Sequence, residues 1–258
     1  MEIATWNVNS LKVRLPRVEE WLAEVQPDVV CMQETKLADD AFPALTFQGL
    51  GYESVHHGQG QWNGVAILSR VGIDDVVANF APGSGDPDPD ARIISARCGG
   101  VHFTSVYVPN GRSLDNDHYQ YKLRWLEALR GWLAAELARE PRLVVLGDFN
   151  IAPEDRDVHD PAAWAGSVHV SEAERAALQA LLQLGFEDVF RRFEQPAGSY
   201  SWWDYRQGAF RRNHGLRIDL VLASPALAAA CRGCSIDVAP RRVERASDHA
   251  PVTAVFDI

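Results

Sequence analysis

The sequence predicts an α/β (α+β) fold in which two packed sheets are covered by helices. Short apolar runs rich in β-branched residues recur along the chain, and only a few amphipathic helices separate them. Helices and strands do not alternate strictly, which argues against a purely parallel sheet. At 258 residues the chain can bury a large core, and we expect a single domain spanning 1–258.

Each predicted strand is a short apolar run bounded by Gly, Pro or polar residues. These runs are Ile3 to Asn7, Val29 to Gln33, Val65 to Ser69, Ile93 to Cys98, Val101 to Val108, Leu143 to Gly147, Ile218 to Ala223 and Val252 to Phe256. Helices are predicted over Pro16 to Glu24, Asn116 to Arg139 and Ser171 to Leu184. The last helix begins with a capping box, Ser171-Glu-Ala-Glu174.

Two long polar segments are predicted as loops. Pro82 to Asp90 is rich in Pro, Gly and Asp, and Ala152 to Val170 carries several aspartates and a tryptophan. Strands follow promptly on either side, so neither segment is expected to link two domains. Loops of this length in a compact domain are often functional.

Composition and cysteine usage limit the class of protein. The content of 47% hydrophobic and 23% charged residues is ordinary for a globular chain. No apolar run approaches the roughly 20 residues of a membrane span, and no signal peptide is recognisable, so we expect a cytoplasmic monomer. Cys31 and Cys98 lie in apolar runs, and Cys231-Arg-Gly-Cys234 lacks the second such motif of a zinc site. All four are expected to be inert thiols.

The net charge of −10 does not exclude a nucleic-acid partner. Carboxylates gathered at a metal site are offset by the bound cation, and a local basic patch is what binds phosphate. Two such patches are predicted, one from Arg206, Arg211, Arg212 and Arg217, the other from Arg241, Arg242 and Arg245.

Carboxylates and amides directly follow several predicted strands. Asn7 and Glu34 each come at the end of a hydrophobic run, where side chains leave the core. Mg²⁺ prefers such oxygen ligands and takes only one or two protein carboxylates. Taken singly, a turn asparagine and a surface glutamate would be the simpler interpretation.

The strongest local signal is Leu146-Gly147-Asp148-Phe149-Asn150, which follows a buried type of strand. Because strand side chains alternate, Asp148 and Asn150 are expected on one side, where they could hold a water and polarise a phosphate oxygen. Tyr107 ends another strand before a Pro-Asn-Gly turn and could offer its hydroxyl to phosphate. A half-buried strand aromatic is an equally good interpretation of Tyr107.

An aspartate–histidine pair is predicted from two distant segments. Asp219 lies in a hydrophobic strand, where an unpaired carboxylate is costly. His249, in Ser247-Asp248-His249-Ala-Pro, would be its partner and would then face phosphate or water with its other nitrogen. Before Asp219 in the sequence, Ser201-Trp-Trp-Asp-Tyr-Arg206 interleaves aromatic and basic residues, a pattern suited to stacking and phosphate contact.

Together these motifs resemble the exonuclease III family of abasic-site (AP) endonucleases, within the endonuclease/exonuclease/phosphatase superfamily. The similarity runs from Thr5-Trp-Asn-Val-Asn to Ser247-Asp-His-Ala-Pro and includes Trp202-Trp-Asp-Tyr-Arg and Gly215-Leu-Arg-Ile-Asp. It implies a four-layer α/β/β/α sandwich of two mixed sheets. It also implies Mg²⁺-dependent incision of duplex DNA 5′ to abasic sites, with 3′→5′ exonuclease and 3′-phosphatase activity, and Mn²⁺ as a possible substitute.

The resemblance also implies roles for individual residues. Glu34 would be the main metal ligand, within a set comprising Asn7, Glu34, Asp148, Asn150, Asp248 and His249. Catalysis would involve Tyr107, Asp148, Asn150, Asp219 and His249, with the general base either Asp148 or His249. The residues expected to contact DNA are Arg92, Asn110, Trp202, Trp203, Arg206, Asn213, Leu216 and Arg217.

Two departures from the family pattern weaken the DNA contacts expected. His214 stands where another basic residue is expected. Leu216 occupies a wall position that is aromatic in some relatives, so Trp202 and Leu216 should form the abasic-sugar pocket with less stacking than two aromatic rings would give. One alternative is a relative acting on a lipid, inositol or RNA phosphate, which should lack the segment from Trp202 to Arg217. A DNA-binding protein without catalysis is the other, although every motif position is filled.

Overall fold

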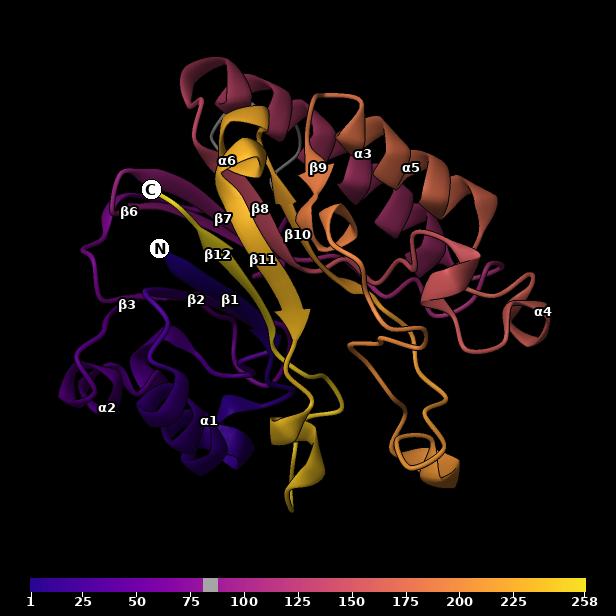
Figure 1. Ribbon diagram of the computed structural model, residues 1–258, viewed down its shortest axis with the longest axis horizontal. Coiled ribbons are helices and arrows are strands. Elements are labelled where there is room, and N and C mark those ends of the chain that lie inside the picture. The colour runs from indigo at the N-terminus through magenta and orange to yellow at the C-terminus, as the bar shows by residue number, and fades with distance from the viewer. Residues whose placement is uncertain (81–87) are drawn as a thin grey trace.

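The computed structural model describes residues 1–80 and 88–258, so residues 82–87 of the predicted loop Pro82 to Asp90 lie outside the described residues. Two sheets face each other, and helices cover both outer faces (Figure 1). Helices α1 (Leu11–Val25) and α2 (Ala44–Gly49) cover one sheet, and α3 (Asp117–Arg139) and α5 (Glu172–Leu182) cover the other. This is the four-layer α/β/β/α sandwich that the sequence predicted.

The two mixed sheets have the same pattern of pairing. The first runs β11 (Cys231–Ile236), β12 (Val252–Phe256), β1 (Glu2–Asn7), β2 (Val29–Gln33), β4 (Val65–Ser69) and β3 (Glu53–His57). The second runs β5 (Asp74–Ala78), β6 (Ile93–Cys98), β7 (Val101–Tyr107), β8 (Leu143–Asp148), β10 (Asp219–Ala223) and β9 (Glu187–Asp188). One central pair in each sheet is parallel, β1 with β2 and β7 with β8, and α1 or α3 makes the crossover.

The main core lies between the sheets. It contains side chains from both, among them Cys31, Ile67, Phe103, Leu146, Val221 and Ala254. Further apolar cores lie between each sheet and its helices. Because the central strands are buried on both faces, they appear in the sequence as continuous apolar runs.

Short helices complete the chain. They are α4 (Pro161–Trp164), α6 (Pro225–Ala230) and the 3₁₀ segments η1 (Asp39–Ala41), η2 (Asp155–Asp157), η3 (Val189–Arg192), η4 (Arg206–Gly208) and η5 (Ala239–Arg242). The segment predicted as a long loop, Ala152 to Val170, therefore contains η2 and α4. Its Val158 also forms an isolated β-bridge with Leu216, which precedes β10.

Most predicted elements are confirmed to within one or two residues, and the largest boundary error is at the start of α1. Helix α1 begins at Leu11, five residues before the predicted start, and contains Pro16. The buried side chains of Leu11, Val18 and Leu22 form the apolar face that sets its true length. The capping box of α5 is present in both halves, since Ser171 and Glu174 each accept the other's backbone N–H.

The state of the cysteines and the character of the helices match what the sequence predicted. All four cysteines are buried free thiols, and burial raises the pKa of each, to about 11 for Cys98. A thiol with a raised pKa is a poor nucleophile at neutral pH, as expected for inert cysteines. Among the described residues, no helix has the length and apolar character needed to cross a membrane.

Candidate active site

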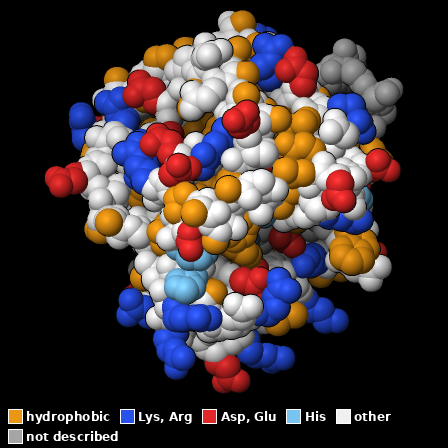
Figure 2. Space-filling model, turned by 90° about the vertical axis from the view of Figure 1, so that its right-hand side faces the viewer, with side chains coloured by type: hydrophobic (Ala, Val, Ile, Leu, Met, Phe, Trp, Pro, Cys, Tyr) orange, Lys and Arg blue, Asp and Glu red, His pale blue; other side chains and the backbone are white. Residues whose placement is uncertain are grey.

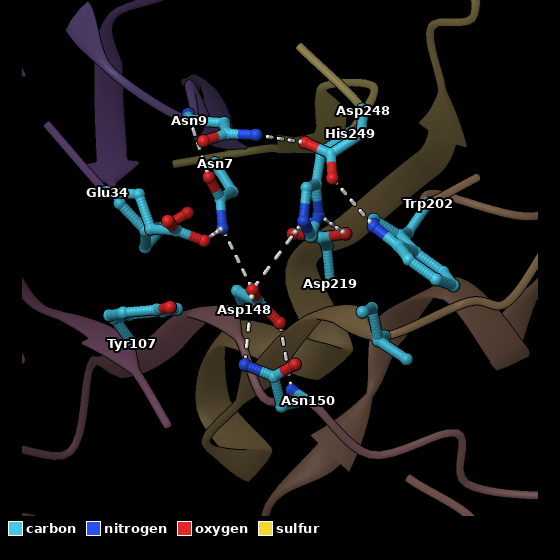
Figure 3. A network of polar contacts seen from close by, with 12 residues as sticks. Asn7, Asn9, Glu34, Tyr107, Asp148, Asn150, Trp202, Asp219, Asp248 and His249 are labelled. Carbon is cyan, nitrogen blue, oxygen red and sulfur yellow. Dashed lines mark hydrogen bonds and ion pairs between the residues drawn. The ribbon is translucent and has the colours of Figure 1, made fainter. Parts of the chain in front are cut away.

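The polar residues of the site meet where strands of both sheets end at one rim (Figure 3). Asn7 ends β1 of the first sheet, and Asp148 ends β8 of the second. The Asn7 amide nitrogen donates to Glu34 Oε1 at 2.8 Å and to Asp148 Oδ2 at 2.9 Å. One buried amide therefore joins the two sheets and holds two carboxylates close together.

Glu34 is held by an unusual turn directly after β2. Glu34 and Lys36 both have positive φ, 50° and 53°, and the turn between them packs against Gly64. A Cβ at Gly64 would lie 2.1 Å from Thr35 Oγ1, so only glycine allows this approach. The turn aims Glu34 into the rim, where Lys36 Nζ lies 2.9 Å from Glu34 Oε2.

Asp148 and Asn150 lie together as predicted, but a turn brings them together rather than the alternation of side chains along a strand. Strand β8 ends at Asp148, and Asn150 has a left-handed backbone with φ of 51°. The turn lets the Asn150 N–H donate to Asp148 Oδ1 at 2.9 Å. The Asn150 amide nitrogen also donates to the Val108 carbonyl, so the residue orients Asp148 from below.

The predicted pairing of Asp219 with His249 is confirmed. His249 Nδ1 lies 2.9 Å from Asp219 Oδ2, and Nε2 lies 3.7 Å from Asp148 Oδ2. Burial by itself lowers the pKa of His249, but Asp219 and then Asp148 outweigh it and raise the pKa to about 10. The imidazole is therefore protonated at neutral pH and turns a cationic edge toward the rim.

Asp148 is the most perturbed carboxyl of the site. Burial, reinforced by the charges of Asp219 and Glu34, raises its pKa to about 7, although His249 and the Asn7 hydrogen bond act in the opposite direction. Lys36 pairs with Glu34, and Asp219 and Asp148 share His249, so three carboxylates meet two cations. A raised pKa at a buried rim position marks a group suited to proton transfer.

The donor atoms fit a divalent cation. Ligand atoms of Glu34 and Asp148 lie within 4.8 Å of each other and of His249, and since protonated His249 has no lone pair to offer, the two carboxylates are the ligands of this group. Two carboxylates with an amide beside them form the oxygen-rich set that Mg²⁺ prefers. Of the other predicted ligands, Asp248 accepts from Asn9 and Trp202, and Asn7 Oδ1 accepts from the Asn9 N–H. Asn150 Oδ1 accepts from the Asn110 side chain at 3.3 Å.

Tyr107 lies at the end of β7 and points toward Glu34 and Asp148 (Figure 3). Burial and those two carboxylates raise its pKa well above the ordinary value, so its hydroxyl stays protonated. The Arg92 guanidinium lies 4.9 Å from the Tyr107 ring and pairs with Asp90. Arg92 is itself 7% exposed, so it supports Tyr107 rather than forming the surface contact with DNA that was expected.

The second half of the predicted DNA-binding segment needs a larger correction. Arg217 is fully buried, donates to Asp157 at 2.7 Å and to Asp188 at 2.7 Å, and does not belong to a surface patch. Trp203 and Leu216 are likewise buried. These three residues anchor the segment inside the fold. The buried guanidinium of Arg217 and the buried indole of Trp203 both bond to partners within the protein, because an unpaired polar group there would be costly.

Other residues of the segment do reach the surface. Trp202 is half-buried, and its indole N–H donates to Asp248 Oδ2 at 3.0 Å. Arg206 is exposed and pairs with Asp204, while exposed Asn213 accepts from the Trp203 indole. Asn110 is exposed beside Asn150. These four side chains are at least partly exposed.

A buried lysine and histidine beneath the site had no sequence signal. Lys122, on α3, donates to the Asn150 carbonyl at 2.6 Å and to Glu174 at 2.5 Å. His169 bonds the same carbonyl at 2.7 Å through Nδ1, and its ring lies 6.3 Å from that of Trp202. Burial, with a contribution from Lys122, lowers the pKa of His169 to about 4. Only the length of the preceding loop could have pointed to this region.

Known proteins resemble this chain along its whole length. The model of the Endonuclease/Exonuclease/phosphatase family matches residues 4–249. Exodeoxyribonuclease III of Haemophilus influenzae is 34% identical, with 99% of this chain and 100% of the relative aligned. Exodeoxyribonuclease of Bacillus subtilis is 31% identical, with both chains fully covered.

Solved structures agree. The 3′–5′ exonuclease NExo of Neisseria meningitidis superposes with a TM-score of 0.97 at 47% identity, and an AP endonuclease from Archaeoglobus fulgidus with 0.94 at 42%. Both chains are covered completely in each case. The resemblance predicted from the motifs is confirmed, and the chain belongs to the endonuclease/exonuclease/phosphatase family, in its exonuclease III group.

Proposed function

We propose that this protein is a Mg²⁺-dependent hydrolase of DNA phosphate esters. It would act at 3′ ends as a 3′-phosphatase and 3′→5′ exonuclease, and would also incise duplex DNA 5′ to abasic sites. The observation that carries the proposal is that Glu34, Asp148 and His249 meet at one rim, beside the half-buried Trp202, which is bonded to Asp248. The chain would work as one domain over residues 1–258 and as a monomer.

The relatives favour action at 3′ ends. The Neisseria protein is named a 3′–5′ exonuclease in one structure and a 3′ phosphatase bound to a product DNA hairpin in another, at 46–47% identity. The archaeal AP endonuclease, at 42% identity, supports incision at abasic sites as the second activity. We expect 3′-end processing to be the faster of the two.

The metal would be held by Glu34 and Asp148, with Asn7 between them. Bound there, Mg²⁺ would neutralise charge on the phosphate oxygens and assist departure of the 3′ oxygen. Mn²⁺, which accepts the same oxygen ligands, would replace it. A metal titration followed by protein fluorescence or calorimetry would show binding apart from activity, and Glu34→Gln should weaken it.

The side chains divide the remaining work. Asp148, whose Oδ1 is oriented by the Asn150 N–H, would take the proton of the attacking water. Protonated His249, fixed by Asp219, would stabilise the developing negative charge on phosphate. The protonated hydroxyl of Tyr107 would donate to another phosphate oxygen. In this assignment the general base is Asp148 rather than His249.

Three DNA substrates test the proposal directly. They are a primer with a 3′-phosphate, a recessed 3′-hydroxyl duplex and a duplex with an internal abasic site, each incubated with Mg²⁺ or with EDTA. We expect all three to be processed only with metal, and 3′-phosphate removal to be fastest. If all three stay intact while a lipid, inositol or RNA phosphate is hydrolysed, the alternative substrate class is correct.

A further inference from the structure

A cavity adjoins the site at Trp202, the residue whose indole donates to Asp248. It has a volume of about 340 Å³, which is in the range of small-ligand pockets. Its aromatic lining comes from the loop before α5 and from the segment around η4, namely His159, Trp164, Trp202 and His214. Arg206 and Arg212 complete its rim. Leu216, the expected wall of the abasic-sugar pocket, is buried and does not line this cavity.

The aromatic rings are arranged as stacking surfaces. His159 and His214 lie face to face, with ring centres 4.7 Å apart and planes 10° apart. Trp164 meets both His159 and Trp202 edge to face, at 6.5 and 6.4 Å. A cavity with several flat ring walls accepts a flat ligand, and nucleobases stack on such rings whatever their sequence.

The rim supplies positive charge. Arg206 and Arg212 are both exposed, and only Arg206 has a carboxylate partner, Asp204, among the residues lining this cavity. Figure 2 shows pale blue histidine atoms bordering a group of Lys and Arg side chains on this face. A ligand with a flat ring and an attached phosphate matches both features. A nucleotide has this chemistry, whereas an aromatic peptide side chain lacks the anion.

Trp202 connects this cavity to the reacting groups. Its indole N–H is bonded to Asp248, and its backbone forms β-bridges with both His249 and Leu216. A ligand in the cavity would therefore lie one side chain away from the carboxylate cluster.

We propose that this cavity binds the unpaired base of the 3′-terminal nucleotide while that nucleotide is removed. The inference rests on the proposed function, and it concerns only one of the activities. Exonuclease and phosphatase reactions both add water across the same bond, between phosphorus and the 3′ oxygen of the retained strand. They differ in what leaves, which is a nucleoside 5′-monophosphate in the first and inorganic phosphate in the second. Only the exonuclease product has a base to occupy the cavity.

The test is the ratio of kcat/KM for exonuclease to kcat/KM for 3′-phosphatase, measured on primers of identical sequence. Trp164→Leu and His214→Ala should each lower this ratio about fivefold or more, as expected for loss of a base-stacking surface. A primer ending in a tetrahydrofuran residue, which has no base, should be cut by wild type and variants at similar rates. Trp62→Leu is the matched control, because Trp62 is an exposed tryptophan that does not line the cavity.

The outcomes separate the two proposals. If wild type processes neither substrate, the proposed function fails. If wild type processes both and the ratio is unchanged in Trp164→Leu and His214→Ala, the cavity does not bind the base. The same conclusion follows if Trp62→Leu lowers the ratio equally. Should Trp164→Leu melt at a lower temperature, the exposed His214 provides the folded variant that decides the question.

Discussion

Two clusters of buried charge lie close to the rim, and their charges are balanced differently. In one, Arg191 and Arg217 face Asp157 and Asp188, so two cations meet two carboxylates. In the active site the carboxylates outnumber the cations, and the pKa of Asp148 is raised to about 7 as a result of burial and its anionic neighbours. A balanced cluster has a structural role, whereas an excess of buried negative charge favours the binding of a cation.

The largest expected effect comes from removing the excess charge. Asp148→Asn should lower kcat by about 10²-fold or more, since it removes the group assigned to proton transfer. Its thermal stability without metal should equal or exceed that of wild type, because a repulsive charge is lost. Steady-state kinetics and melting curves with and without Mg²⁺ measure both. A clear loss of stability without metal would show that the Asp148 charge is not in excess.

Breaking the balanced cluster should have the opposite outcome. Arg217→Met leaves Asp157 and Asp188 without their shared partner and should lower the free energy of unfolding by about 3–5 kcal/mol. Urea denaturation measures this loss. Below its melting temperature the variant should retain most of its activity, because Arg217 does not reach the rim. A variant that is fully stable but inactive would contradict the structural role.

The smallest effect on stability is expected at Arg206, whose charge is exposed and not buried in either cluster. Arg206 forms its ion pair with Asp204 in solvent, so Arg206→Ala should change the free energy of unfolding by less than about 1 kcal/mol. If Arg206 meets a DNA phosphate, the dependence of log affinity on log salt should weaken by about one unit of slope. Filter binding or fluorescence anisotropy over several salt concentrations measures this slope. An unchanged slope would exclude the phosphate contact.

The fold could be predicted largely because its central strands are buried on both faces. Strands β2, β4, β6 and β12 have the boundaries that the apolar runs predicted. The strands that were missed, β3, β5, β9 and β11, are the edge strands of the two sheets. Edge strands such as β5, with its sequence Asp-Asp-Val-Val-Ala, are partly exposed and need no continuous apolar run.

The site was only partly predictable, for a similar reason. Strand-end residues such as Glu34 and Asp148 stand out because a polar side chain follows an apolar run. Lys122 and His169 act through the carbonyl of Asn150, and no short motif records a contact between distant segments. Arg217 was misplaced because a charged residue in sequence looks the same whether it lies at the surface or pairs inside.

The hydrogen bond from Asn7 to Asp148 makes the active site sensitive to the relative position of the two sheets. Strands β1 and β8 lie against each other across the core, and Asn7 and Asp148 stand at their ends. Sliding one sheet over the other by even an ångström would separate groups that now lie 2.9 Å apart. The rate of hydrolysis therefore depends on how well the two sheets are aligned with each other. Repacking the layer between the sheets could slow the enzyme without altering any residue of the site.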